Sequence, residues 1–250
     1  MKKCVIIVAI LCLPAACLAY EASMFNLAVP TNLVTQQADF NVRHRFFGPV
    51  DDDPLETLFG TDAGANVNLI MRGSVWRTLE VRGGYTRDFS EWTLGAGYME
   101  AVPAAHLRAQ AGIEFFSFEE SDISGRDENL FYYIAVQAEP IAGRFVPVLN
   151  LGYDGHNERF GLGLGARLEL LERLSILGEY YPVLDRDEDD PTSPVGPEDA
   201  FAFGFEFRTY GHHFAFLVGN SWDMSPRRLM LGTFLDDLYF GFNIQRLLEF

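Results

Sequence analysis

The chain has 250 residues and a formal net charge of −16, which argues against nucleic-acid binding because phosphate contacts need a basic surface. Hydrophobic residues make up 48% and charged residues 22%, which fits neither a disordered chain nor a coiled coil, and no apolar run reaches the length of a membrane helix. Aromatic residues reach 14%, with 22 Phe beside 23 Gly, a combination that favours strands and tight turns.

Residues 1–19 are predicted to be a cleaved signal peptide that exports the protein. Lys2 and Lys3 precede the apolar run Val5–Leu13, and small residues lead to a cleavage site after Ala19. The alternative is a lipoprotein signal with Cys17 lipidated, which is disfavoured because proline stands where such signals have leucine. All three cysteines lie in this segment, so disulfides and thiolate sites are excluded from the mature chain.

The mature chain is predicted to begin with a periplasmic segment, residues 20–37, followed by one domain, residues 38–250. In that domain bulky apolar side chains recur at every second position, as in strands. In Ala200–Arg208, for example, four phenylalanines alternate with small or charged residues. The alternation predicts twelve strands: Asp39–Phe47, Gly64–Arg72, Leu79–Arg87, Trp92–Tyr98, His106–Phe116, Leu130–Ala138, Arg144–Tyr153, Arg159–Leu170, Ser175–Leu184, Ala200–Arg208, His213–Asn220 and Leu238–Gln245.

Charged side chains occupy the strand face opposite the bulky apolar row. A water-soluble sandwich would turn this face outward, whereas a membrane barrel would turn it into the lumen. Strands of about ten residues, glycines on the charged face and mixed-sign pairs two residues apart favour the barrel. The predicted lumen network comprises Arg43, Arg45, Arg72, Glu80, Arg82, Arg108, Glu114, Arg167, Glu169, Glu179, Glu206 and Arg208.

The connections between the predicted strands fall into two alternating classes. The even-numbered connections are short, whereas the odd-numbered class holds every long one, including Gly48–Ala63 and the acidic segment Asp185–Asp199. Outer-membrane barrels place short turns on the periplasmic side and long loops outside the cell. The predicted fold class is therefore all-β: a transmembrane antiparallel up-and-down β-barrel of about twelve strands, with short periplasmic turns and longer acidic extracellular loops.

The chain ends in Phe250, which follows the last predicted strand. Apolar residues share its parity, apart from Arg246. A terminal aromatic residue in this setting is similar to the signal that the barrel-assembly machinery binds. We therefore expect Phe250 to act as the assembly signal and that machinery to be a partner.

Several short motifs resemble a bacterial family of membrane-bound β-barrels of unknown function. They occur in the same order from about residue 38 to the end of the chain. The resemblance implies an outer-membrane barrel and supplies no activity. The motifs are His44–Phe46, Leu58–Val67, Phe160–Arg167, Glu179–Tyr181, Gly211–Phe214, Asn220–Ser221 and Tyr239–Ile244.

No residue pattern selects a catalytic or metal site. His212 and His213 are adjacent, but neighbours on a strand point to opposite faces and cannot easily bind one ion. The acidic run Asp185–Asp190 lacks the glycine and the ligand alternation of an EF-hand loop. A Ser-His-acid hydrolase on the barrel wall stays open as the minor alternative, although nothing selects a nucleophile. No enzyme activity, cofactor or metal is predicted.

These observations predict a barrel in the outer membrane of a Gram-negative bacterium, in contact with outer-membrane lipid. A barrel of eight strands is filled by its own side chains, and one of about sixteen leaves an open channel. Twelve strands lie between these cases, so the favoured function is a narrow channel for small solutes or ions. A structural barrel that docks a periplasmic or surface partner is the alternative. The sequence selects neither the solute nor the partner.

Overall fold

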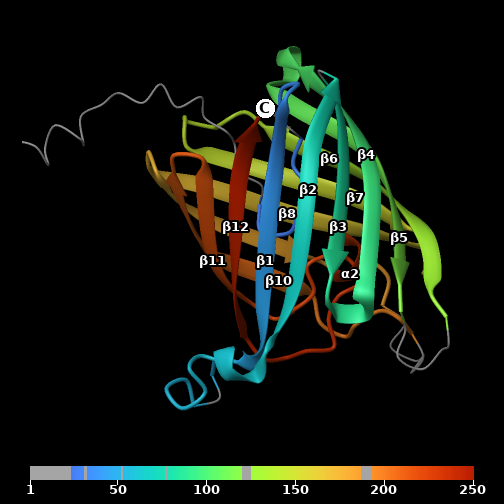
Figure 1. Ribbon diagram of the computed structural model, residues 1–250, viewed down its shortest axis with the longest axis vertical. Helices are drawn as coiled ribbons and strands as arrows, with labels where there is room; N and C mark the ends of the chain where they lie inside the picture. The colour runs from blue at the N-terminus through green and yellow to red at the C-terminus, as the bar shows by residue number, and fades with distance from the viewer. Residues whose placement is uncertain (1–23, 31–32, 52, 77, 120–124, 187–192) are drawn as a thin grey trace, which may run out of the picture.

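The computed structural model describes residues 24–30, 33–51, 53–76, 78–119, 125–186 and 193–250. Its strands form one closed antiparallel barrel in which each strand pairs with its neighbours in the sequence (Figure 1). The first and last strands close the ring. This confirms the predicted all-β, up-and-down architecture. The predicted signal peptide, residues 1–19, lies outside the described residues, as does the acidic stretch 187–192.

The described barrel has twelve strands, the predicted number. They are β1 (Gln37–Pro49), β2 (Ala65–Trp76), β3 (Leu79–Thr86), β4 (Glu91–Val102), β5 (Leu107–Phe118), β6 (Asp127–Ala138), β7 (Phe145–Asp154), β8 (Arg159–Leu171), β9 (Leu174–Tyr181), β10 (Ala200–Thr209), β11 (His212–Gly219) and β12 (Tyr239–Glu249). The helical turns are η1 (Thr61–Ala63), η2 (Asp88–Ser90), η3 (Pro103–Ala105) and α2 (Pro226–Leu229). Among the described residues, no helix is long and apolar enough to cross a membrane.

Most predicted strand boundaries lie within two residues of those in the structure, and five differ by three or four residues: the ends of β2, β4, β9 and β12 and the start of β6. Strand β9 ends at Tyr181, three residues before the predicted end, because Pro182 has no amide proton for the strand ladder. Strand β4 continues beyond its predicted end to Val102, which still pairs with Leu107 of β5. The connection between these two strands is therefore only the turn that holds η3.

The apolar row of each strand faces outward and the charged row faces inward. In β10, Phe203 and Phe205 are 55% and 47% exposed, whereas Glu206 is 1% exposed. A water-soluble sandwich would bury the phenylalanines and expose the glutamate. This arrangement is the one a surrounding lipid phase requires, because an outward carboxylate would lose its hydration there.

A charge on the outward face should therefore prevent assembly. We expect Phe205→Arg and Leu164→Arg, both near the middle of their strands, to cost about 2–4 kcal/mol each at the bilayer centre. The matched control is Tyr210→Arg, which places the same charge in the turn after β10. The measurement is the fraction of protein that folds in lipid vesicles, read from heat-modifiable gel mobility. Equal folding of Phe205→Arg and Tyr210→Arg would contradict an outward lipid-facing row.

The long connections after β1 and β11 meet at one end of the barrel, opposite the C-terminus (Figure 1). Short turns occupy the other end, so the two classes of connection separate in space. Which end faces the cell exterior stays a prediction. Phe250 follows β12, and its backbone amide donates to the carbonyl of Gln36.

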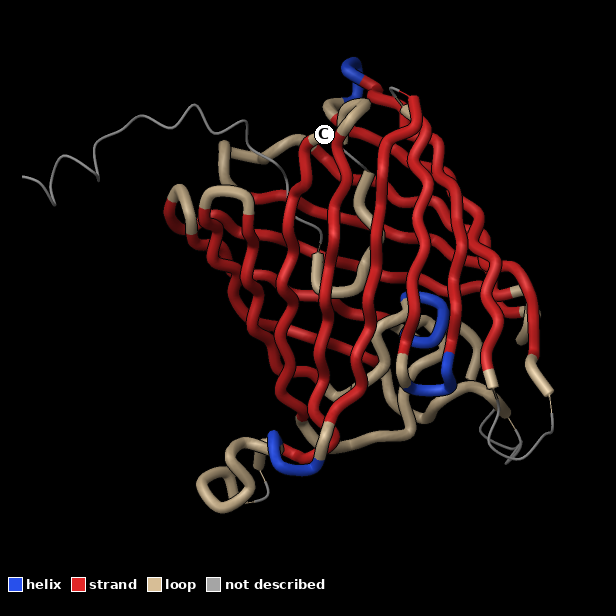
Figure 2. Tube along the Cα trace, in the orientation of Figure 1, coloured by secondary structure: helices blue, strands red, loops and turns tan. Residues whose placement is uncertain are grey.

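The segment before β1 departs from the sequence prediction. Residues 20–37 were expected to precede the barrel on the periplasmic side, but Met24–Val29 run as an irregular stretch, bent at Phe25–Leu27, inside the ring of strands (Figure 2). Phe25 and Leu27 are no more than 1% exposed. The physical reason is that this stretch is largely apolar and finds a lumen lined with glycines, where its side chains can be buried.

Candidate functional site in the barrel lumen

Two stretches of chain that belong to no strand occupy the lumen. The first is Met24–Val29, called here the N-terminal strap. The second is the connection Ser221–Asp237, called the luminal loop, which contains α2. Met224, Leu229 and Met230 of the loop are at most 4% exposed, and the last two join the strap in one apolar cluster. The barrel interior is therefore filled by these segments as well as by wall side chains.

Glu179 of β9 anchors the strap. Its Oε1 accepts hydrogen bonds from the backbone amides of Asn26 at 2.8 Å and Leu27 at 3.0 Å. Its Oε2 accepts from Asn26 Nδ2 at 3.1 Å and from the Tyr181 hydroxyl at 3.0 Å. Hydrogen bonds to a buried carboxylate are stronger than those between neutral groups. One wall side chain thus satisfies two buried backbone amides of the strap.

Asparagine side chains bind the remaining backbone groups of the strap. Asn150 of β7 accepts from the amide of Ala28 and donates to its carbonyl, both at 2.8 Å. Asn243 of β12 donates to the carbonyl of Phe25 at 2.8 Å. Buried backbone groups need partners, and here side chains provide them in place of a neighbouring strand. The strap is therefore held in one register without being part of the sheet.

Glycines of β8 make room for the strap. A Cβ atom at Gly163 would lie 2.4 Å from Leu27 Cδ2, and one at Gly165 would lie 2.6 Å from Leu27 Cδ1. The sequence indicated that these glycines leave space in the lumen. The structure shows that the space is occupied, so a side chain at Gly163 would displace Leu27.

Arg227 holds the luminal loop in place. Its guanidinium lies 2.8 Å from Glu91 and 3.2 Å from Asp154, measured between nitrogen and carboxylate oxygen. It also stacks 3.8 Å from the ring centroid of Phe116. The Arg227 side chain is 3% exposed and its carboxylate partners no more so. A buried, doubly paired arginine of this kind ties α2 to β4 and β7.

All twelve residues of the predicted lumen network lie on the inward parity of their strands. Their ion pairs join them into small groups of two or three residues. Arg72 pairs with Asp39 at 2.9 Å and lies 3.9 Å from Glu80, and Arg82 pairs with Glu114 at 2.9 Å. The remaining members are Arg43, Arg45 and Glu179, which contact the strap or loop; Arg167, Glu169 and Arg208, which pair at 3.5–3.6 Å; Glu206, which pairs with His213; and Arg108 on β5.

Several residues of the site were missing from the sequence prediction. Asp39 shares the parity of Arg43 and Arg45, so the alternation contained the signal for it. Asn150 and Asn243 also lie on inward parities but carry no charge. Glu91 and Asp154 stand at strand ends, and Arg227 lies in a connection. No periodicity in the sequence marks residues at strand ends or in connections between strands.

A buried cluster on β9, β10 and β11 contains the residue types of a hydrolase. His213 Nδ1 lies 2.7 Å from Glu206 Oε1. Ser175 of β9 is opposite Glu206 in the register of β9 with β10. Ser175 is 0% exposed, so an ester substrate has no access to its hydroxyl. His212 points elsewhere and contacts Arg246 at 2.9 Å. The cluster therefore has the residue types of a triad without an accessible nucleophile.

The luminal loop carries an acid whose ionisation is opposed by its surroundings. Burial raises the pKa of the Asp223 carboxyl to about 6, against the attraction of Arg228 and with the repulsion of Asp88 and Glu91. The folded protein therefore holds this proton more tightly than the unfolded chain does. The stabilisation is complete below about pH 4, the ordinary pKa of an aspartate, and is lost as the pH rises through about 6.

Replacing this acid should flatten the pH dependence of stability. We expect the free energy of unfolding of the wild type to fall by about 1–2 kcal/mol between pH 4 and pH 6 relative to Asp223→Asn. Urea unfolding of the refolded barrel at a series of pH values measures this difference. Parallel curves for the wild type and Asp223→Asn would show that Asp223 does not titrate in this range.

Comparison with known proteins places the fold among membrane barrels. Residues 145–248 match the family model described as "Membrane bound beta barrel domain (DUF5777)". This part of the chain is therefore similar to a membrane-bound β-barrel domain. The match runs from the start of β7 almost to the end of β12, and it confirms the family resemblance seen in the sequence. No match is found among curated proteins.

Solved structures of membrane barrels share the architecture. The KdgM porin is 9% identical with a TM-score of 0.52, covering 84% of this chain and 98% of that chain. An active-site mutant of outer membrane phospholipase A from Escherichia coli is 11% identical with a TM-score of 0.50, covering 88% and 93%. At these identities the likeness concerns the fold alone. The fold is thus one that serves both a porin and an enzyme.

Proposed function

We propose that this protein is an outer-membrane channel for small solutes that the N-terminal strap and the luminal loop hold closed. The observation that carries the proposal is the strap itself. A barrel that accommodates two extra stretches of chain has more interior than its wall side chains fill. Displacement of those stretches would leave a polar passage lined by the charged face.

The contacts of the strap suit a reversible closure. Its backbone groups bond to the side chains of Glu179, Asn150 and Asn243, which water can replace when the strap leaves. A strand of the sheet could not leave without opening the barrel. The outward apolar face and the likeness to a porin fold support a membrane channel, and the buried Ser175 argues against the hydrolase alternative.

Deletion of Met24–Val29 tests the proposal in planar lipid bilayers. We expect the full chain to show background conductance with rare openings, and the deletion variant to show sustained single-channel currents. Heat-modifiable gel mobility must show that both proteins fold. Arg144→Gln, in an exposed turn, controls for nonspecific effects of substitution.

A folded deletion variant with background conductance would refute the channel. The docking alternative would then be favoured, with the strap as a structural element of a closed barrel.

A further inference from the structure

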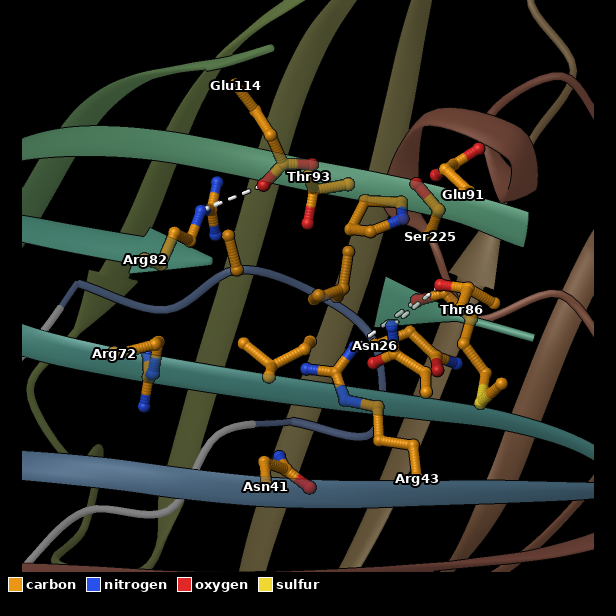
Figure 3. A pocket seen from close by; sticks show the side chains of 16 residues that line it. Asn26, Asn41, Arg43, Arg72, Arg82, Thr86, Glu91, Thr93, Glu114 and Ser225 are labelled. Carbon is orange, nitrogen blue, oxygen red and sulfur yellow. Dashed lines mark hydrogen bonds and ion pairs between the residues drawn. The ribbon is translucent and has the colours of Figure 1, made fainter. Parts of the chain in front are cut away.

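A small cavity lies between the strap, the luminal loop and the inner wall of β1 to β5. Its volume is about 60 Å³. Arg43 points into it from β1, and Arg72 and Arg82 approach it from β2 and β3 (Figure 3). Ser225 of the loop and Thr93 of β4 also line it. The lining of the cavity is thus part polar and part apolar, and it includes three arginines.

The charges that line the cavity leave one positive charge in excess. Of its three arginines, Arg72 is paired with Asp39 and Arg82 with Glu114. The cavity lining also holds two carboxylates, Glu114 and Glu91. Glu91 is paired with arginines of the luminal loop that do not line the cavity. Of the three arginines that line the cavity, Arg43 is therefore the one without an ion-pair partner in the described part of the chain.

Arg43 lacks the partners that a buried guanidinium needs. The residue is 8% exposed, and its Nη1 donates to the carbonyl of Met224 at 3.2 Å. Its Nε is buried without a hydrogen-bond partner. Among the described residues, no carboxylate lies within ion-pair distance of it, and Glu179 attracts it only from farther away. Arginine stays protonated in proteins, so this charge is uncompensated at close range.

An anion in the cavity would remove this deficit. A guanidinium offers two parallel N–H donors that match the two oxygens of a carboxylate. The hydroxyls of Ser225 and Thr93 line the same space and can donate as well. A cavity needs a volume of about 10–15 Å³ to hold one water molecule, so a volume of about 60 Å³ suits an ion of a few heavy atoms, such as formate or acetate, better than a sugar acid.

We propose that this cavity is a binding site for a small monocarboxylate, with the guanidinium of Arg43 as its main ligand. The carboxylate binds to the free Nε edge of Arg43 and supplies the missing negative charge. The site lies where the strap and the loop meet the wall, so a bound anion also stabilises the closed arrangement. The binding measurement does not depend on the proposed channel activity, because it is made on protein in detergent.

Thermal unfolding of the refolded full chain in detergent tests the site, since a ligand that binds only the folded state raises the midpoint. The probe is sodium formate, compared with sodium gluconate at equal ionic strength. We expect formate to raise the midpoint of the wild type in a saturable manner, and the larger gluconate to raise it far less at the same concentration. Arg43→Gln should weaken formate binding at least tenfold, whereas Arg144→Gln should bind as the wild type does.

Arg43→Lys keeps the proposal testable if Arg43→Gln fails to fold. It retains the positive charge but loses the paired donors, so we expect binding to weaken severalfold. Equal shifts with formate and gluconate in the wild type would overturn the proposal. Undiminished formate binding in Arg43→Gln, or in Arg43→Lys where only that variant folds, would overturn it too.

Discussion

Replacing Glu179 with alanine should release the N-terminal strap from the barrel wall. The change removes the acceptor of three hydrogen bonds from the strap, two of them from backbone amides. Bonds to a charged acceptor contribute about 1.5–3 kcal/mol each, and the freed amides regain water only when the strap moves out. Losing about 3 kcal/mol of local stability increases the population of the displaced strap by about a hundredfold.

Hydrogen–deuterium exchange of the peptide that contains Asn26 and Leu27 measures this effect. We expect exchange in Glu179→Ala to be about a hundredfold faster than in the wild type, with more frequent channel openings in planar bilayers. The matched control is Glu169→Ala, because Glu169 is also a luminal acid but pairs with Arg167 and Arg208 of the barrel wall. Unchanged exchange in Glu179→Ala would mean that other contacts hold the strap.

The strand pattern was predictable because lipid and lumen impose opposite demands on successive residues. In Phe201–Arg208 every outward position is a phenylalanine, and the inward positions are small or charged. The alternation yields strand number, order and facing directly. The error at the end of β9 has a local cause that was also visible in the sequence, since Pro182 cannot donate to a strand ladder.

The contents of the lumen were not predictable in this way. Asn26 and Glu179 are separated by 153 positions, and no local period connects them. Gly163 and Gly165 indicated free space in the lumen, but they carry no information about which segment enters it. A pattern of alternation describes a wall. It does not describe a stretch such as the strap, whose backbone bonds to scattered side chains.

The twelve predicted charges illustrate the same limit. Parity placed them all on the inner face, yet it did not give their partners. Arg167, Glu169 and Arg208 form contacts with one another, whereas Glu206 binds His213. Arg43 and Arg45 contact the loop and the strap instead of wall carboxylates. Pairing depends on strand register and on which segments enter the barrel.

The second large effect is expected at the luminal loop, where Arg227→Ala should detach α2 from the wall. The change leaves the buried Asp154 without its arginine and removes the cation from the face of Phe116. Breaking one side of a buried ion pair costs about 3–5 kcal/mol, because the remaining charge has lost its partner and is not hydrated. The loop should respond by moving into water.

Arg228→Ala is the matched control for this prediction. Arg228 binds the same Glu91 at 3.0 Å, but its side chain is 19% exposed and Arg227 still neutralises the carboxylate after the substitution. We therefore expect a loss of about 1 kcal/mol or less, in the range of partly exposed pairs. The two variants change the same residue type one position apart.

Limited proteolysis separates the two outcomes, because trypsin cleaves after arginine and each variant retains one of the two. We expect rapid cleavage after Arg228 in Arg227→Ala and slow cleavage after Arg227 in Arg228→Ala, with both barrels still heat-modifiable. Adding Glu91→Gln to Arg227→Ala should leave the loop accessible, since Asp154 still lacks an arginine partner and keeps only its hydrogen bonds from His156 and Asn157. Equal resistance of both single variants would show that apolar burial of Met224, Leu229 and Met230 holds the loop without the ion pairs.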